Sequence, residues 1–357
     1  MKIGTLTFHR AQNYGGVLQC YALLKFLQNQ GYDVEVVDYR CPKIERAYRI
    51  IDTYSFKSIL ASLLYLAKRI KAKKNFASFR KKYLKISDKK FKSPGDFSGQ
   101  YDICIMGSDQ VWTLRLVGGF NPIFYGDFSP SIRKIGYAVS IAEINHFSVE
   151  ERNVMAKHID NFTRFSTRED SFRDEMIRLS GKKVYSVLDP SLLLSMNEYD
   201  PILELPQEEN YILYYQQEYH PLTKNLIVDI AHQVGAKMVV VVTGTKEHYD
   251  IPCHYYDTDS LSVPKFLGLF KKAKVVFTSS FHGTAYSIVF RKDFYFVANY
   301  APDRARNLLV KCGAEDRLVY STDKVAFSKV DYSKVEPCLE NHRKESMQFL
   351  ISAIENK

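Results

Sequence analysis

Residues 2–40 read KIGTLTFHRAQNYGGVLQCYALLKFLQNQGYDVEVVDYR, and this stretch decides the fold. Residues 2–8 and 33–40 are short runs of strand-forming side chains. Between them, residues 17–30 carry apolar side chains at helical spacing and end at Gly31, which suits the end of a helix. A strand, a helix and a second strand in this order predict a βαβ unit with parallel strands.

The alternation of strands and helices continues along the chain in two stretches. Further strands are predicted at 101–107, 134–140, 162–167 and 184–190, and then at 210–217, 236–244, 274–280 and 293–299. Helices are predicted at 148–161, 168–179, 221–234, 262–273, 284–291 and 338–355. This alternation predicts an α/β fold in which helices cover both faces of parallel sheets.

A polar segment with two prolines, residues 194–210, separates the two stretches and is typical of a linker. We therefore predict two Rossmann-like domains with a cleft between them, at residues 1–195 and 196–337. A basic, helical insertion occupies residues 41–100 of the first domain. A helix at 338–357 follows the second domain, from where it can pack back on the first.

Composition limits the class of protein. The chain of 357 residues is 46% hydrophobic and 25% charged, which is typical of a globular protein. No apolar run approaches the roughly 20 residues of a membrane span, and the first residues alternate like a strand, so we expect a cytoplasmic protein without a signal peptide. The six cysteines form no CxxC pair, which indicates buried thiols. His248, Cys253 and His254 match no zinc-site spacing, and neither a metal nor a cofactor is predicted.

Much of the net charge of +10 lies between Lys68 and Lys92, where twelve Lys or Arg residues accompany a single acid, Asp88. One interpretation is a solvated helical face. Another is a surface for an anionic acceptor or an anionic membrane, which would hold the protein at the inner face of that membrane. Nothing in the segment resembles a nucleic-acid-binding module, so no nucleic-acid partner is predicted.

Ligands of open α/β sheets bind beyond the carboxyl ends of the strands, so the turns that follow strands hold the candidate site residues. The first such turn contains Asn13, Tyr14, Gly15 and Gly16. Glycines let a backbone approach a ligand, and the amides at a helix N-terminus attract anions. The alternative is a tight turn without a ligand, because two glycines are a weak signal.

The second turn contains Ser108, Asp109 and the single tryptophan, Trp112. A carboxylate here can act as a general base or orient a hydroxyl, although Asp109 could also cap the next helix. Trp112 could stack on a sugar ring or fill the core, and the sequence does not separate these two roles.

The third turn contains Arg168, whose planar guanidinium suits a carboxylate or a phosphate. Positive charge is unfavourable at a helix N-terminus, so a ligand would explain this arginine. The acids Glu169 and Asp170 suit the helix dipole and offer a structural explanation instead.

The fourth turn contains His282, which follows a strand end and precedes Gly283. A glycine turn at this place would put the imidazole at a helix N-terminus that faces the predicted cleft. The alternative is a buried histidine that belongs to the core.

Together these stretches resemble the polysaccharide pyruvyl transferase family. The matching segments occur in the family's order between residue 3 and about residue 317: TFHRAQNYGGVLQCYAL, YDICIMGSDQVW, YAVSIA, STRED, LDPSLLL and TSSFHGTAYSIVF. The resemblance implies a glycosyltransferase-B-like fold and transfer of a pyruvyl group from phosphoenolpyruvate, as co-substrate, to sugar hydroxyls. The product would be a pyruvate ketal on a bacterial surface glycan or its precursor, and the acceptor could be a nucleotide sugar, a lipid-linked saccharide or a polymer.

Roles for single residues follow from the resemblance and from side-chain chemistry. His282 and Asp109 are assigned as catalytic, with protonated His282 binding the donor anion and acting as acid, and Asp109 taking a proton from the acceptor. Donor binding is assigned to Arg168, Ser280, Phe281, Gly283 and Thr284. Acceptor binding is assigned to Asn13, Tyr14, Gly15, Gly16, Ser108 and Trp112.

The chain departs from the family at Ser280, because better-studied members have Arg-Leu-His where residues 280–282 read SFH. Another cation, Arg291, Arg304 or Arg306, could take the place of that arginine, or the donor could differ. Two rival functions stay open: a nucleotide-sugar glycosyltransferase of the same fold, and a non-catalytic glycan-binding protein.

Overall fold

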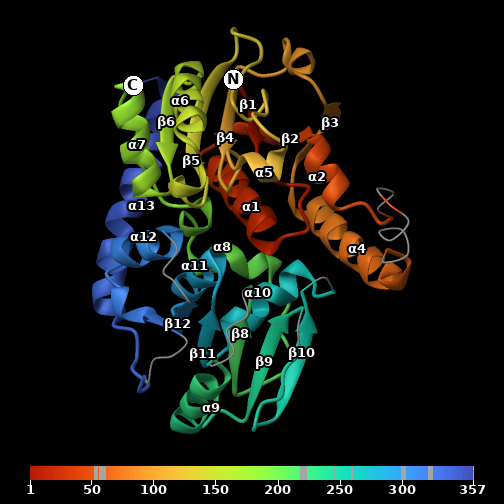
Figure 1. The fold of residues 1–357 in the computed structure, drawn as a ribbon, viewed down its shortest axis with the longest axis vertical. Coiled ribbons are helices and arrows are strands. Elements are labelled where there is room, and N and C mark those ends of the chain that lie inside the picture. The colour runs from red at the N-terminus through yellow and green to blue at the C-terminus, as the bar shows by residue number, and fades with distance from the viewer. Residues whose placement is uncertain are drawn as a thin grey trace. The chain divides into compact units, whose positions relative to one another are not determined.

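The computed structural model of the protein describes residues 1–51, 55, 62–217, 223–244, 246–258, 260–298, 303–320 and 325–356 (Figure 1). The predicted insertion at 41–100, helix at 221–234 and strand at 293–299 each include a few other residues, and those parts lie outside the described residues.

Strands and helices alternate along the described chain. The strands are β1 (Lys2–Leu6), β2 (Asp33–Tyr39), β3 (Ile86–Phe91), β4 (Ile103–Gly107), β5 (Arg133–Val139), β6 (Arg164–Thr167), β7 (Tyr185–Ser186), β8 (Tyr211–Tyr215), β9 (Met238–Thr243), β10 (Cys253–Asp257), β11 (Val275–Thr278), β12 (Asp293–Ala298) and β13 (Leu318–Tyr320). The helices are α1 (Tyr14–Asn29), α2 (Pro42–Ala47), α4 (Leu66–Tyr83), α5 (Leu114–Val117), α6 (Val149–His158), α7 (Asp170–Ser180), α8 (Met196–Tyr199), α9 (Thr223–Val234), α10 (Val263–Lys272), α11 (Phe281–Val289), α12 (Asp303–Lys311) and α13 (Tyr332–Glu355).

The first sheet has parallel strands in the order β3-β2-β1-β4-β5-β6-β7 (Figure 1). The order reverses between β1 and β4, which pair with Leu6 opposite Met106. The segments that follow these two strands therefore leave the sheet at the same edge. In α/β proteins, such a switch point is where ligands bind.

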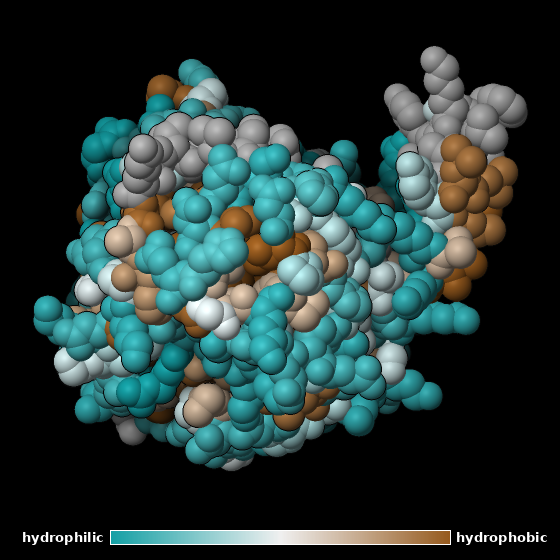
Figure 2. Space-filling view, turned by 90° about the horizontal axis from the view of Figure 1, so that it is seen from below, coloured by the Kyte–Doolittle hydropathy of each residue, from teal (hydrophilic) through white to brown (hydrophobic). Residues whose placement is uncertain are grey.

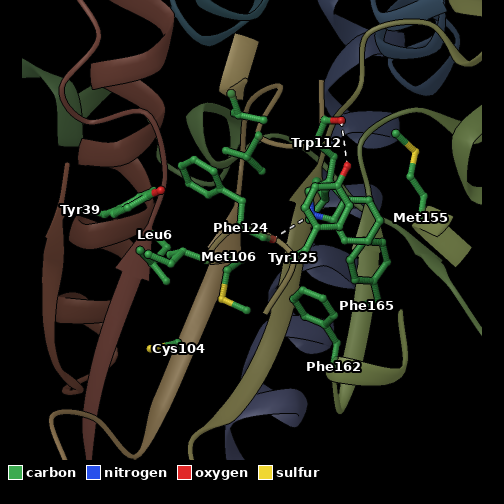
Figure 3. Packing of buried hydrophobic residues seen from close by; sticks show 14 of the residues in the cluster. Leu6, Tyr39, Cys104, Met106, Trp112, Phe124, Tyr125, Met155, Phe162 and Phe165 are labelled. Carbon is green, nitrogen blue, oxygen red and sulfur yellow. Dashed lines mark hydrogen bonds between the residues drawn. The ribbon is translucent and has the colours of Figure 1, made fainter. Parts of the chain in front are cut away.

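Aromatic side chains fill the core beside this sheet (Figure 3). The ring of Trp112 stacks on Tyr125 with the ring centroids 4.3 Å apart, and the ring centroid of Phe165 lies 4.8 Å from that of Trp112. Trp112 Nε1 donates a hydrogen bond to the Phe124 carbonyl oxygen at 2.9 Å, and Tyr125 donates its hydroxyl to the Trp112 carbonyl oxygen at 3.1 Å. Because these buried polar atoms are satisfied, the packing holds the loop after β4 in place.

The second sheet has parallel strands in the order β10-β9-β8-β11-β12-β13. Its order reverses between β8 and β11, where Tyr215 lies opposite Thr278. The second sheet therefore has a switch point of the same kind, and the stretch that contains His282 follows β11 directly.

The chain divides into two compact units. One consists of residues 1–66, 80–193 and 341–357, and the other of residues 67–79 and 194–340. Each unit contains one parallel sheet, so the predicted class, α/β with two Rossmann-like domains, is confirmed for each unit taken by itself. Residues 67–79 belong to the second unit, whereas the prediction assigned the whole insertion at 41–100 to the first.

Three strands were not predicted, and each of them lies at the edge of a sheet: β3, β10 and β13. Strand β3 reads ISDKKF, and charged side chains of this kind suit an edge that faces water. An edge strand lacks the continuous apolar run of a central parallel strand, which explains the omission. Helix α12 was also missed, and α13 begins at Tyr332 instead of 338, with Pro337 inside it.

Candidate functional site

Side chains that follow β1, β4, β6 and β7 form one hydrogen-bonded network at the carboxyl edge of the first sheet. Thr7 donates its hydroxyl to the Ser108 carbonyl oxygen at 3.0 Å and accepts from Gln19 Nε2 at 2.7 Å. Asp189 Oδ2 accepts from Ser108 Oγ at 2.8 Å and from Arg168 Nη1 at 2.7 Å. The network therefore ties together turns that are far apart in the sequence.

Asp109 follows β4 in a left-handed backbone conformation, with φ of 71°. Gly107 has φ of 118°, and a Cβ atom on it would lie 2.1 Å from a carbonyl oxygen of β5, so only glycine fits there. Asp109 Oδ1 accepts from the Gln110 amide at 2.9 Å and lies 3.8 Å from Arg168 Nη2. Among the described residues, Oδ2 has no hydrogen-bond partner. The next helix has Thr113 as its N-cap, so Asp109 is not its cap.

Arg168 is buried among three carboxylates. Its Nη1 lies 2.7 Å from Asp189 Oδ2, its Nε 3.6 Å from Glu169 Oε1, and its Nη2 3.8 Å from Asp109 Oδ1. Burial acts to lower the pKa of this guanidinium, but the carboxylates, Asp189 foremost, outweigh burial and raise the pKa. Because three carboxylates already surround this one cation, Arg168 is better suited to hold Asp109 in place than to attract an anionic donor. The donor-binding role of Arg168 stays a prediction.

The first turn of α1 lies beside Asp109. Asn13 is the N-cap of the helix, and its Oδ1 accepts from the Gly16 amide at 3.0 Å. A Cβ atom on Gly16 would lie 3.3 Å from Asp109 Oδ2. Gln19 Nε2 also donates to the Gly16 carbonyl oxygen at 2.8 Å, which joins this turn to the network. The structure therefore brings Asn13, Gly16 and Asp109 together.

The other residues predicted to bind the acceptor are buried. Trp112 has no exposed surface, and a sugar could stack on it only by displacing Tyr125. The structure thus corrects the prediction for Trp112, which belongs to the core. Ser108 is also buried, with its hydroxyl bound to a carboxylate, and Tyr14 and Gly15 are buried within α1.

In the second unit, β11 passes almost directly into α11, and His282 lies in the first turn of that helix. A Cβ atom on Gly283 would lie 2.1 Å from Thr278 Oγ1, so glycine allows the helix to start this close to the strand. The Ser280 amide donates to Thr278 Oγ1 at 3.0 Å. The Thr284 hydroxyl donates to the Ser280 carbonyl oxygen at 3.3 Å.

One of the predicted donor residues in this turn is half-buried and the others are buried. His282 is 8% exposed, and Ser280 is half-buried. Phe281, Gly283 and Thr284 are buried and support the turn. Ser280 is therefore the predicted donor residue of this turn with the most exposed surface, and His282 lies beside it in the first turn of α11.

The three arginines considered as substitutes lie in two different places. Arg291 follows the C-terminal end of α11, and its distance from His282 along the helix is about 13 Å, so it does not lie at the start of α11. Arg304 and Arg306 lie at the start of α12, which follows β12, the strand paired with β11. These two arginines therefore lie at the same edge of the sheet as the start of α11.

The two histidines near residue 250 each pair with a carboxylate. His254 Nδ1 lies 3.2 Å from a Glu208 oxygen, and His248 pairs with Asp250 at 3.6 Å. In the part of the chain that the structure describes, no three His, Cys, Asp or Glu residues are grouped as metal ligands. Nor is any described helix long and apolar enough to cross a membrane.

A sequence profile of the polysaccharide pyruvyl transferase family matches residues 13–300. The chain belongs to this family. The matched range of this pyruvyl transferase family member includes the start of α1, the loop after β4, Arg168 and His282. None of the curated proteins matches the sequence.

Several solved structures are similar to this family member over almost their whole length. The UDP-GlcNAc 2-epimerase from Neisseria meningitidis, bound to UDP-GlcNAc, is 10% identical, with 100% of each chain covered and a TM-score of 0.49. The UDP-N-acetylglucosamine 2-epimerase from Rickettsia bellii is 9% identical, with 100% of this chain and 97% of that chain covered and a TM-score of 0.47.

Ser140 also belongs to the network, because its hydroxyl donates a hydrogen bond to Glu169. Sequence analysis did not identify Ser140 or its pairing with Glu169, and it also missed Thr7, Gln19 and Asp189. Asp189 lies in the segment LDPSLLL that carried part of the family resemblance, and its position at a strand end was the available signal. Its partner Arg168 belongs to another segment, so only the fold reveals the pair.

Proposed function

We propose that this protein transfers the pyruvyl group of phosphoenolpyruvate to two hydroxyls of a sugar in a surface-glycan precursor, forming a pyruvate ketal. The observation that carries the proposal is the family match across residues 13–300. The reaction needs one group that delivers a proton to carbon and one that removes a proton from a hydroxyl. We assign these tasks to His282 and Asp109.

The start of α11 suits the donor. Phosphoenolpyruvate carries a phosphate and a carboxylate, and the amides of a helix N-terminus attract both. In its imidazolium form, His282 adds a positive charge and a transferable proton. Arg304 and Arg306, at the same sheet edge, are the cations we assign in place of the family arginine at Ser280.

Asp109 suits the task of base because its two oxygens differ. Oδ1 is held by the Gln110 amide and lies near Arg168, whereas Oδ2 has no partner among the described residues and faces Gly16. An acceptor hydroxyl that reaches Oδ2 can transfer its proton there. Asn13 and Gly16 line the position that such a hydroxyl would occupy.

His282 protonates the methylene carbon of phosphoenolpyruvate, and the neighbouring carbon gains oxocarbenium character. A sugar hydroxyl attacks that carbon and gives its proton to Asp109. A second hydroxyl then attacks the same carbon, the bond from this carbon to the phosphate oxygen breaks, and the second hydroxyl proton leaves with inorganic phosphate.

The test is transfer of isotope-labelled pyruvate from phosphoenolpyruvate to a panel of acceptors: nucleotide sugars, lipid-linked saccharides and polymers. We expect labelled glycan and one phosphate released per ketal formed. His282→Ala and Asp109→Asn should each lower the rate by about a hundredfold or more. His248→Ala changes a histidine that is almost fully exposed, and it serves as the matched control with an unchanged rate.

Two outcomes would contradict the proposal. Sugar transfer from a nucleotide sugar without phosphoenolpyruvate would indicate a glycosyltransferase. Full activity of His282→Ala would remove that residue from the donor site, while unchanged circular dichroism of the variant shows that the fold is intact.

A further inference from the structure

Three consecutive large hydrophobic side chains are exposed just before α4. Leu63, Leu64 and Tyr65 are 50%, 77% and 57% exposed, whereas the other large hydrophobic side chains exposed among the described residues are isolated in the sequence. Figure 2 shows hydrophobic atoms gathered at the right of the view beside the residues drawn in grey, where Figure 1 has the start of α4. Isolated exposed apolar side chains are common, but a contiguous group indicates an interaction surface.

The same part of the chain lacks acidic residues. Residues 53–87 contain ten Lys or Arg and no Asp or Glu. Lys68 pairs with a carboxylate at 2.7 Å, but Lys71, Lys73 and Lys74 are exposed and have no acidic partner among the described residues. These three lysines therefore keep an uncompensated positive charge in the second and third turns of α4, which begins directly after the hydrophobic group.

Helix α4 packs by one face only. Ala72, Phe76 and Phe79 are buried, and their spacing of four and three residues places them on one side of the helix. Lys71 and Lys74 point away from that side and are exposed. The packed face fixes the helix, and the apolar group and the lysines stay available on the surface.

We infer that residues 63–74 form a docking surface for the anionic face of a lipid bilayer. The side chains of Leu63, Leu64 and Tyr65 enter the headgroup boundary, and the lysines of α4 bind the anionic headgroups. This surface narrows the membrane contact predicted at 68–92 to its first part and adds the apolar anchor that precedes it.

Charge and apolar surface together favour a bilayer over two other occupants, a second copy of the chain and a nucleic acid. A second copy of the chain would bring two groups of unpaired lysines together, which is unfavourable. A nucleic acid would use the lysines but not three exposed apolar side chains. Of these three occupants, the anionic bilayer alone satisfies both halves of the surface. Docking would favour lipid-carried saccharides as acceptors, and this last step alone rests on the proposed function.

The experiment is flotation of the full chain with vesicles of phosphatidylcholine alone or with added phosphatidylglycerol. We expect binding to the anionic vesicles only, and weaker binding as salt is raised. Lys71→Gln, Lys73→Gln and Lys74→Gln together should weaken binding roughly a hundredfold, at about fivefold for each lysine. Leu63→Ser with Leu64→Ser should abolish stable flotation.

Control variants remove the same charge, or one exposed leucine, elsewhere on the chain. The combined change of Lys224, Lys237 and Lys344 to Gln alters three exposed lysines, and Leu205→Ser alters an exposed leucine, and both should bind like the wild type. Three results would overturn the inference. The protein could bind neutral and anionic vesicles equally well, or the control variants could lose as much binding as the test variants. The protein could also form a dimer that the changes at Leu63 and Leu64 abolish. Because flotation needs no turnover, its failure is distinct from failure of the proposed reaction.

Discussion

Asp109 Oδ2 lies 3.3 Å from the position that a Cβ atom on Gly16 would occupy. Asp109 follows β4, and Gly16 lies in the first turn of α1, which follows β1. The two residues therefore lie on either side of the switch point of the first sheet. The absent side chain at Gly16 leaves the partner-free oxygen of Asp109 open toward the start of a helix. A methyl group at that position would occupy the space that we assign to the acceptor hydroxyl.

Gly16→Ala should therefore lower turnover more than stability. The added methyl group is tight against Asp109 Oδ2 but meets no other atom closer than 3.6 Å, so we expect a loss of about 1 kcal/mol or less in the free energy of unfolding. The rate should fall about tenfold or more, because the acceptor hydroxyl is displaced from its base. Gly95→Ala is the control, since its Cβ atom would meet nothing within 4 Å. Normal turnover of Gly16→Ala would move the acceptor away from this turn.

Arg168→Lys separates two roles for this arginine. A lysine keeps one positive charge among the carboxylates but cannot reach Asp189, Glu169 and Asp109 at the same time as a guanidinium does. If Arg168 positions Asp109, kcat should fall about tenfold while the KM for phosphoenolpyruvate stays near the wild-type value. A raised KM with little change in kcat would instead support the donor-binding role that the family resemblance implies.

Arg168→Met should affect folding as well. It leaves Glu169 and Asp189 buried without their cation, and loss of one partner from such a group costs about 3–5 kcal/mol. Urea unfolding of Arg168→Met and Arg168→Lys, measured side by side, gives this difference. A stability of Arg168→Met close to that of wild type would mean that the carboxylates become protonated or solvated at little cost once the arginine is removed.

The sequence predicts the central parts of the fold better than the edges. Parallel strands that are buried on both faces are continuous apolar runs, and β8, β9 and β11 were predicted for this reason. Strand β3 could not be predicted in this way, because its lysines are compatible with an edge that faces water. Helix α12 was missed for a similar reason, because its first turn is polar and the edge strand that follows it, β13, was not predicted either.

The sequence likewise predicts some residues of the candidate site and not others. A residue at a strand end can be located from its own segment, and Asp109, Arg168 and His282 were located in this way. Their partners depend on the order of strands in the sheet, which determines that Asp189 meets Arg168 and that Gly16 meets Asp109. The role of Trp112 was ambiguous in the sequence because a buried and a ligand-stacking tryptophan follow a strand equally well.

Gly283→Ala tests the close approach of α11 to β11. Its Cβ atom would lie 2.1 Å from Thr278 Oγ1, so the start of the helix must move or the threonine must rotate. We expect a loss of about 1–3 kcal/mol in the free energy of unfolding and reduced binding of phosphoenolpyruvate. The double change with Thr278→Ala removes the closest clashing atom and leaves the Cβ atom of residue 278 at 2.9 Å, so its cost should be less than the sum of the two single changes. Full additivity would show that the two sites do not interact.

His9 should make the free energy of unfolding depend on pH. It is buried in the loop after β1, where its Nε2 lies 3.2 Å from Asp38 Oδ1 and its Nδ1 3.3 Å from the Thr7 carbonyl oxygen. Burial lowers the pKa of His9 below its usual 6.5, and this outweighs the opposite effect of Asp38. Burial alone would raise the pKa of Asp38, but hydrogen bonds from His9 and Arg40 lower it to about 2.

Both shifts make the unfolded chain the stronger binder of protons. Below pH 6.5 the unfolded His9 gains a proton that the folded His9 resists, so the free energy of unfolding should decrease by up to about 1 kcal/mol between pH 6.5 and 5.5. The contribution of Asp38 is present above its unfolded value of 3.8 and is lost only as the pH falls toward 2. Urea unfolding at pH 7.5, 6.5 and 5.5 measures the first effect. His9→Gln should flatten this dependence, whereas His248→Gln, at an exposed histidine, should leave it unchanged. A steeper loss of stability in His9→Gln would mean that the buried imidazole is already charged at neutral pH.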